Sequence, residues 1–134
     1  MGLVWNDSLK TGIPEIDQQH KQLIEQMNLL SNAIEQNKGE AEIRKIINFL
    51  SSYVQQHFGF EEVCMQRYLC PVAEQNQAAH SHFIKNFKEI REDLKLKGST
   101  LILAEKINKN LLDWFGNHIR KIDTQLKPCM PGKK

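Results

Sequence analysis

Long apolar runs, a signal sequence and a strong net charge are all absent from this sequence. No apolar stretch approaches the roughly 20 residues that a membrane-spanning helix needs. The first residues, Met1 to Asp7, lack the charged segment followed by an apolar one that begins a secretory signal. The formal net charge of +2 is too small to indicate nucleic acid or an anionic membrane as a partner. We therefore expect a cytoplasmic protein that binds neither nucleic acid nor a membrane.

Cysteine is scarce, and its spacing is not that of a metal or redox motif. The chain has three cysteines, Cys64, Cys70 and Cys129, and no Cys-x-x-Cys pair. An odd number without paired spacing is typical of reduced thiols. We expect these cysteines to be core or boundary residues, with metal binding or redox sensing as the less favoured alternative.

Strand-like alternation, repeats and low-complexity segments are also missing, whereas helical periodicity occurs four times. Apolar residues recur at steps of three and four in the ranges 15–36, 41–68, 71–96 and 101–126. Pro71 fits the first turn of the third helix, and Pro128 and Pro131 are expected to end the fourth.

Short connections between such helices predict an all-α fold, an antiparallel up-down-up-down four-helix bundle. The length of 134 residues fits a single domain, 1–134. The first dozen residues, with Trp5 and Ile13, are expected to form an N-terminal arm packed on the bundle.

Histidines occupy the apolar faces of all four predicted helices. They are His20, His57, His80 and His118, and Glu61 follows His57 by one turn on the same face. One such histidine is more often a hydrogen-bonded core residue than a metal ligand, but here every helix carries one. Burying a carboxylate and four imidazoles without partners is costly, and a metal ion removes that cost. The pattern therefore predicts a metal site in the core.

The residue types narrow the choice of metal. Histidine combined with carboxylate fits iron, manganese or zinc, and the lack of a cysteine cluster argues against structural zinc. One ion does not easily collect ligands from four helices, whereas two ions bridged by carboxylates can. His82 lies about 200° round the helix from His80, so it is expected on the surface.

Four motifs that contain these residues resemble the bacterial hemerythrins. They are Ile16-Asp17-Gln18-Gln19-His20, His57-Phe58-x-x-Glu61-Glu62, His80-x-x-Phe83 and Trp114-x3-His118-Ile119-x3-Asp123. The similarity runs from Trp5 to Asp123, across all four predicted helices. It implies a hemerythrin-like domain that holds two iron ions in an oxo- or hydroxo-bridged di-iron centre.

The resemblance also implies a role for each ligand. One iron is held by His20 and His57 and has the open position where dioxygen binds, and the other is held by His80 and His118. Glu61 and Asp123 are the residues implied to bridge both ions. Asp123 lies five residues beyond His118, about 140° away round an ideal α-helix. We therefore expect a local distortion of this helix, such as a π-bulge.

At Asn76 the sequence departs from the family. The family has a further histidine one turn before the position of His80, and this chain has Asn76 there. We expect water or the Asn76 carbonyl to complete the second iron, which makes Asn76 a weak or water-mediated ligand. A replaceable water would favour reaction with peroxide or oxygen. In the alternative, Asn76 only hydrogen-bonds a water ligand and the function is unchanged.

A set of apolar residues within one turn of the ligand histidines also matches the family. Each of them alone is more often ordinary core. Together they would keep water and protons away from bound oxygen. The expected oxygen pocket consists of Leu23, Phe58, Trp114, Phe115 and Ile119.

These features favour a non-haem di-iron protein that binds dioxygen and stores, delivers or senses it. No catalytic side chain is expected, because the metals carry the chemistry. A carrier is favoured over an enzyme, although Asn76 leaves open a di-iron enzyme that reduces peroxide, oxygen or nitric oxide. A further alternative is a redox or oxygen sensor that acts on a protein partner. The small ligand is dioxygen, a related diatomic or peroxide, and the sequence names no protein partner.

Overall fold

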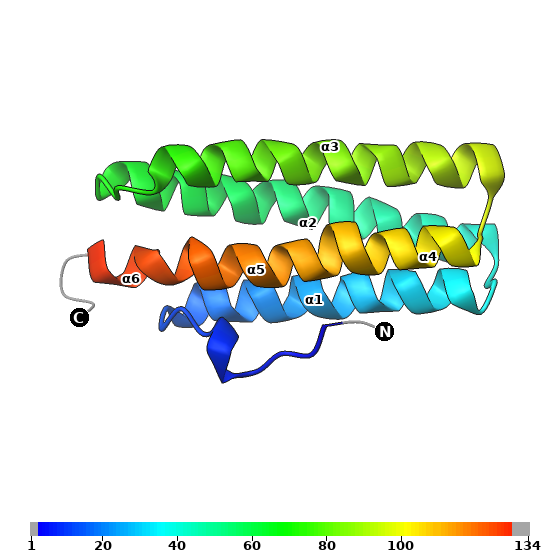
Figure 1. The fold of residues 1–134 in the computed structure, drawn as a ribbon, viewed down its shortest axis with the longest axis horizontal. Coiled ribbons are helices and arrows are strands. Elements are labelled where there is room, and N and C mark those ends of the chain that lie inside the picture. The colour runs from blue at the N-terminus through cyan, green and yellow to red at the C-terminus, as the bar shows by residue number, and fades with distance from the viewer. Residues whose placement is uncertain (1–2, 130–134) are drawn as a thin grey trace.

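The structure, a computed structural model, describes residues 3–129, apart from the side chains of Glu40, Lys127 and Cys129. Four helical rods lie side by side in alternating directions, and the described residues contain no strand (Figure 1). The first three rods are α1 (Pro14–Glu35), α2 (Glu40–Arg67) and α3 (Ala73–Lys97). The fourth consists of α4 (Leu101–Ile107), the π-helical segment η2 (Asn108–Asp113) and α5 (Trp114–Lys121). The all-α bundle predicted from the sequence is confirmed.

A short helical tail follows the fourth rod. It consists of the 3-10 segment η3 (Asp123–Gln125) and α6 (Leu126–Cys129). Pro128 therefore lies inside a helix, where the sequence led us to expect a stop, and Pro131 lies outside the described residues. Proline is tolerated there because the first turn of a helix has no use for its missing N–H.

Local chemistry explains where the rods begin and end. Pro14 opens α1 at its first turn, and the Asp17 carboxylate accepts hydrogen bonds from the N–H and hydroxyl of Thr11, both at 2.8 Å. The third rod ends at Gly98, whose φ of +72° favours glycine, and Thr100 caps the next helix through the N–H of Leu103 at 3.0 Å. Helix α3 starts at Ala73, so Pro71 lies in the turn before it and not in its first turn.

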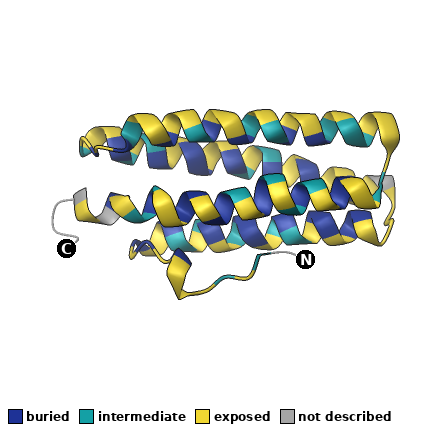
Figure 2. Ribbon diagram, viewed as in Figure 1, coloured by how far each residue is buried: buried dark blue, intermediate teal, exposed yellow. Residues whose placement is uncertain are grey.

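The apolar faces of the rods meet in a main core, and a smaller apolar cluster forms around Ile16, Met65 and Leu126. Figure 2 shows buried residues on the inward side of each rod and exposed residues on the outward side. Leu23, Met27 and Leu30 of α1 are fully buried, as is Leu111 of the fourth rod. Burying each such side chain contributes about 1.5–3 kcal/mol to folding. Among residues 3–129, no helix is both long and apolar enough to cross a membrane.

The N-terminal arm packs on the bundle as the sequence predicted. It contains a short 3-10 turn, η1 (Asp7–Leu9), and the backbone carbonyl of Leu3 accepts a hydrogen bond from Asn28 at 2.7 Å. The Leu3 side chain covers Gly116 so closely that a Cβ there would lie 3.1 Å from Leu3 Cδ2. Trp5 lies under the Lys21 ammonium, 5.5 Å from the ring centroid, and Ile13 is buried.

One expectation about the cysteines is wrong. Cys70 is disulfide-bonded, whereas an odd number of cysteines without paired spacing led us to expect reduced thiols. Disulfide formation depends on how close two Cα atoms lie in the fold, which sequence spacing does not reveal. Cys64 is a free, half-buried thiol whose pKa is raised by burial, and the side chain of Cys129 lies outside the described residues. The cytoplasmic location stays a prediction.

Candidate metal centre

The six residues expected to bind metal converge between the four rods, toward the end of the bundle where α1 begins and α2 ends. Each is at most 5% exposed to solvent. They come from every rod because each lies on the core-facing stripe of its helix, or directly after it. The residues are His20 of α1, His57 and Glu61 of α2, His80 of α3, His118 of α5 and Asp123 of η3.

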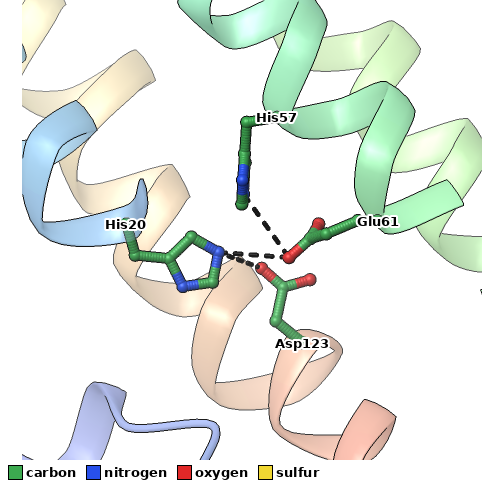
Figure 3. A group of neighbouring side chains, drawn as sticks. All are labelled: His20, His57, Glu61 and Asp123. Carbon is green, nitrogen blue, oxygen red and sulfur yellow. Dashed lines mark hydrogen bonds and ion pairs between the residues drawn. The ribbon is translucent and has the colours of Figure 1, made fainter. Parts of the chain in front are cut away.

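Four of these side chains form a first cluster, His20, His57, Glu61 and Asp123 (Figure 3). His20 Nε2 lies 3.1 Å from Glu61 Oε2 and 3.1 Å from Asp123 Oδ2. His57 Nε2 lies 3.4 Å from the same Glu61 oxygen. The imidazole nitrogens and carboxylate oxygens therefore face one another at spacings that one metal ion can span.

A second cluster, Glu61, His80, His118 and Asp123, shares both carboxylates with the first. His80 Nε2 lies 3.2 Å from Glu61 Oε1, and His118 Nε2 lies 3.1 Å from Asp123 Oδ1. Within each cluster the potential ligand atoms all lie within 4.8 Å of one another. Each carboxylate thus turns one oxygen to the first cluster and the other oxygen to the second.

A break in the fourth rod brings Asp123 to the centre. The α-helix ends at Lys121, Ile122 takes φ −117° and ψ −55°, and a 3-10 segment starts at Asp123. The distortion expected from the spacing of His118 and Asp123 is present, as a break followed by a tighter turn. A π-helical segment is also present, but it lies before His118, at Asn108–Asp113.

Several buried polar atoms of the centre have no hydrogen-bond partner, and bound cations would satisfy them. Buried atoms without a hydrogen-bond partner include the Nε2 atoms of His57, His80 and His118 and both oxygens of Asp123. Leaving a buried polar group unpaired costs about 1–3 kcal/mol, and more when the group is charged. Metal ions between these atoms would take all of them as ligands, and the nitrogen and oxygen donors suit iron, manganese or zinc. The residues present therefore fit a pair of metal ions.

The pKa values show how tightly these groups interact. Burial alone would lower the pKa of His20, but the nearby carboxylates of Asp123 and Glu61 raise it to about 9. Burial lowers the pKa of His57. Burial alone would raise the pKa of Glu61, but the histidines beside it hold that pKa well below its usual range. The carboxylate is therefore ionised at neutral pH and available as a ligand.

Two further residues fix the orientation of His57 and His80, and no role was predicted for them from the sequence. His57 Nδ1 lies 2.6 Å from the amide oxygen of Gln19, and His80 Nδ1 lies 2.9 Å from a carboxylate oxygen of Glu62. An oxygen of this kind only accepts, so each Nδ1–H donates and leaves Nε2 free to face the centre. Both lie inside the motifs that resemble the family, with Gln19 directly before His20 and Glu62 directly after Glu61.

Asn76 is fully buried, and neither its amide oxygen nor its amide nitrogen has a hydrogen-bond partner. It lies one turn before His80 on α3, on the same face of the helix. His82, in contrast, is exposed, as predicted from its position round the helix. The second cluster thus has an unsatisfied polar side chain beside it.

Aromatic and aliphatic side chains enclose the centre. Phe58 stacks on His80 with ring centroids 3.7 Å apart, and Trp114 stacks on His118 at 4.9 Å. Phe115 meets His20 edge-on at 5.3 Å. Leu23 and Ile119, the other two residues of the expected oxygen pocket, are fully buried. All of these except the half-buried Trp114 are closed to solvent.

The fold and the site define a helical-bundle protein with a buried centre suited to metal binding. The chain belongs to the hemerythrin family, since the family profile, described as the hemerythrin HHE cation-binding domain, matches residues 11–130. It is similar to the bacteriohemerythrin of Pseudomonas paraeruginosa, with 36% identity over 121 residues that cover 90% of this chain and 76% of the relative. The bacteriohemerythrin of Methylococcus capsulatus is 26% identical over 120 residues, 90% of this chain and 89% of that protein.

Proposed function

We propose that the chain is a non-haem di-iron protein that binds dioxygen reversibly and stores, delivers or senses it. The observation that carries this proposal is the division of each carboxylate between the two clusters. Glu61 and Asp123 each direct one oxygen at the His20–His57 pair and the other at the His80–His118 pair. Two metal ions a few ångströms apart need such bridging ligands.

The proposed ligands of the iron pair are the six residues of the two clusters. His20 and His57 would hold one ion and His80 and His118 the other, with Glu61 and Asp123 shared. When bound, the iron pair supplies the electrons and the open coordination position that dioxygen binding requires. The chain contributes preformed ligands, because Gln19 and Glu62 already hold the rings of His57 and His80 in position.

Exclusion of water supports reversible binding over turnover. Leu23, Phe115 and Ile119 are fully buried, and Phe58 is 2% exposed. An apolar lining would keep water away from oxygen bound at the site and offers it no proton donor. We propose that this lining keeps dioxygen binding reversible.

The test is metal analysis and an optical spectrum of the same sample. Chain loaded with ferrous iron without oxygen is expected to hold about two irons, one for each cluster. Admission of air should produce a visible absorption band, and removal of oxygen should abolish it. One zinc ion and no iron would overturn the di-iron proposal, and a band that oxygen removal leaves unchanged would overturn reversible binding.

A second function, two-electron reduction of peroxide to water, is favoured by one specific observation. Asn76 is fully buried beside the second cluster with both amide atoms unpaired. An amide oxygen is a weaker donor than imidazole, so the ion held by His80 and His118 would exchange a water ligand more readily. Peroxide consumption by the iron-loaded chain, with an electron donor added, separates an enzyme from a carrier.

A further inference from the structure

A cavity of about 620 Å³ lies away from the candidate metal centre. It is at the end of the bundle where the α1–α2 loop and the α3–α4 turn lie (Figure 1). Ile47 in its wall is ten residues before His57 on α2, which is about 15 Å along the helix. The lining comes from the α1–α2 loop, the first part of α2, the last part of α3 and the α3–α4 turn.

Among the residues that the structure describes, the charged ones that line this cavity are all cations. They are Lys38, Arg44, Arg91 and Lys95, and no described lining residue is acidic. Within the described part of the chain, Lys38, Arg91 and Lys95 form no ion pair, whereas Lys106 on the next helix is paired with Asp93 at 2.7 Å. Arg91 and Lys95 are one turn apart, so both side chains lie on one face of α3. Unpaired charges of one sign around a hollow attract a ligand of the opposite sign.

The floor of the cavity is apolar. Ile43 and Ile47 of α2 are 2% and 5% exposed and belong to the main core, and half-buried Leu94 of α3 packs against that core. A bare inorganic anion would leave this floor uncovered. The cavity therefore offers two different surfaces, a cationic rim and an aliphatic base.

The start of α2 adds to the positive potential. This helix begins after Gly39, and no side chain caps its N-terminus. Gly39 and Ile43, at the start of this helix, line the cavity, so the positive end of a 28-residue helix dipole lies next to it. The backbone and the side chains favour the same sign of ligand.

We infer that this cavity binds a small amphipathic organic anion, whose phosphate or carboxylate group lies among Lys38, Arg91 and Lys95. Its apolar body covers Ile43 and Ile47. Arginine suits either head group, because its guanidinium donates two parallel hydrogen bonds to two oxygens. The volume lies within the range of about 300–1,000 Å³ that is usual for small-molecule pockets. The inference goes beyond the proposed oxygen-binding function and does not depend on it.

The first experiment uses calorimetry on the iron-loaded chain to measure how much the charged head group and the apolar body of the ligand each contribute to affinity. Decyl phosphate, kept below its micelle concentration, should bind with one-to-one stoichiometry. It should bind at least about tenfold more tightly than inorganic phosphate or decanol. If decanol bound as tightly as decyl phosphate, the cationic rim would have no part in binding. If inorganic phosphate bound as tightly, the apolar floor would have none. Binding to anionic vesicles without binding of monomeric decyl phosphate would replace the inference by a membrane contact.

The second experiment locates the site with matched variants. Lys95→Glu should weaken decyl phosphate binding about tenfold, because it reverses a charge in the rim. Lys97→Glu makes the same change two residues away, outside the lining, and should alter affinity by less than about twofold. Equal effects of the two variants would mean that net charge alone drives binding.

Two tryptophan variants test the location of the site without changing the charge of the chain. Asn48→Trp should fill the cavity and abolish binding, whereas Gln56→Trp, on the exposed surface of α2, should not. Glycine amide resonances report the position directly, since Gly39 and Gly98 line the cavity and Gly59 and Gly116 do not. Shifts confined to Gly59 or Gly116 on titration would overturn the assignment.

Discussion

The two clusters of the candidate metal centre have the same donors but different neighbours. Each has two imidazole nitrogens and one oxygen from each shared carboxylate. In the first cluster the outer nitrogen of His57 meets the neutral amide of Gln19, whereas in the second the outer nitrogen of His80 meets the carboxylate of Glu62. A carboxylate partner makes the imidazole a stronger electron donor than an amide does. Two sites with equal ligands thus differ through their surroundings.

A second difference is the unpaired amide of Asn76, which lies on the side of the second cluster. These two differences between the clusters act against each other. Glu62 makes His80 a stronger donor, whereas Asn76 stands where an imidazole would be a stronger donor. We infer that the second ion depends more on its surroundings than the first. Changes to these residues therefore test the comparison between the clusters.

The largest effect is expected from Glu61→Ala, which removes a ligand from both clusters at once. Iron content should fall from about two per chain to almost none. The variant should also lose the stabilisation that bound metal gives the fold, about 3–4 kcal/mol when metal is in hundred- to thousandfold excess over its dissociation constant.

His82→Ala is the control for this change, because His82 is exposed and lies outside both clusters. Its iron content and melting temperature should match those of the unaltered chain. Loss of metal from His82→Ala, or retention of both ions by Glu61→Ala, would contradict the shared role of Glu61.

The next effect is the pH dependence of the metal-free chain, which reports on His20. Its pKa is raised from 6.5 to about 9, so its stabilising contribution is complete below pH 6.5 and is lost as the pH rises through 9. His80, whose pKa is also raised, acts in the same direction, and Glu61 stays ionised throughout. The free energy of unfolding should fall by about 2–3 kcal/mol between pH 7 and 9.5, as urea titrations would measure.

His20→Asn is the control for the pH experiment, and it should flatten most of this dependence. A free energy of unfolding that rises over the same interval would show that His20 is neutral in the folded, metal-free chain. It would then contribute to the first cluster only as a neutral ring.

Asn76→His should make the second cluster richer in imidazole than the first. A third imidazole would displace an exchangeable water, so the lifetime of the oxygen-dependent absorption band should rise at least about tenfold and peroxide consumption should fall. The larger ring carries a repacking cost of about 1–3 kcal/mol. Stopped-flow spectroscopy at matched iron content measures both rates.

Gln75→His adds a histidine to the exposed neighbouring position and serves as the control for Asn76→His. It should leave both rates unchanged. Equal lifetimes and equal peroxide consumption in Asn76→His and the unaltered chain would mean that residue 76 does not tune the centre. The carrier function would then stand without its enzymatic rival.

The smallest effect is expected from Glu62→Gln, which makes the outer partner of His80 an amide, like that of His57. Affinity for the second ion should fall by about tenfold or less, because an outer hydrogen bond weakens and no ligand is lost. Competition with a chelator measures this change, with Glu74→Gln on the exposed surface of α3 as the control. A larger loss from the first cluster than from the second would reverse the assignment of Glu62.

Much of the candidate centre could be predicted, because the direction in which each histidine points depends only on the periodicity of its own helix. His20, His57, His80 and His118 lie on the apolar stripes of their helices, and a helix with one apolar face turns that face to the core. Asp123 could be predicted only through the resemblance, since an ideal helix would direct it elsewhere. Its position depends on the break at Ile122, which no periodic pattern encodes.

The sequence by itself determined four amphipathic helices, their order and the residues that face inward, because these follow from a repeat of 3.6 residues along one chain. The tertiary structure alone decided which atoms meet across helices. Glu62 meets His80, each carboxylate divides its oxygens between two clusters, and Cys70 lies within reach of a disulfide partner. The cavity between α2 and α3 likewise depends on how these helices pack, so the sequence could not predict it. Such contacts depend on how the rods are rotated and spaced against each other, and side-chain packing sets that geometry only when all the rods are assembled.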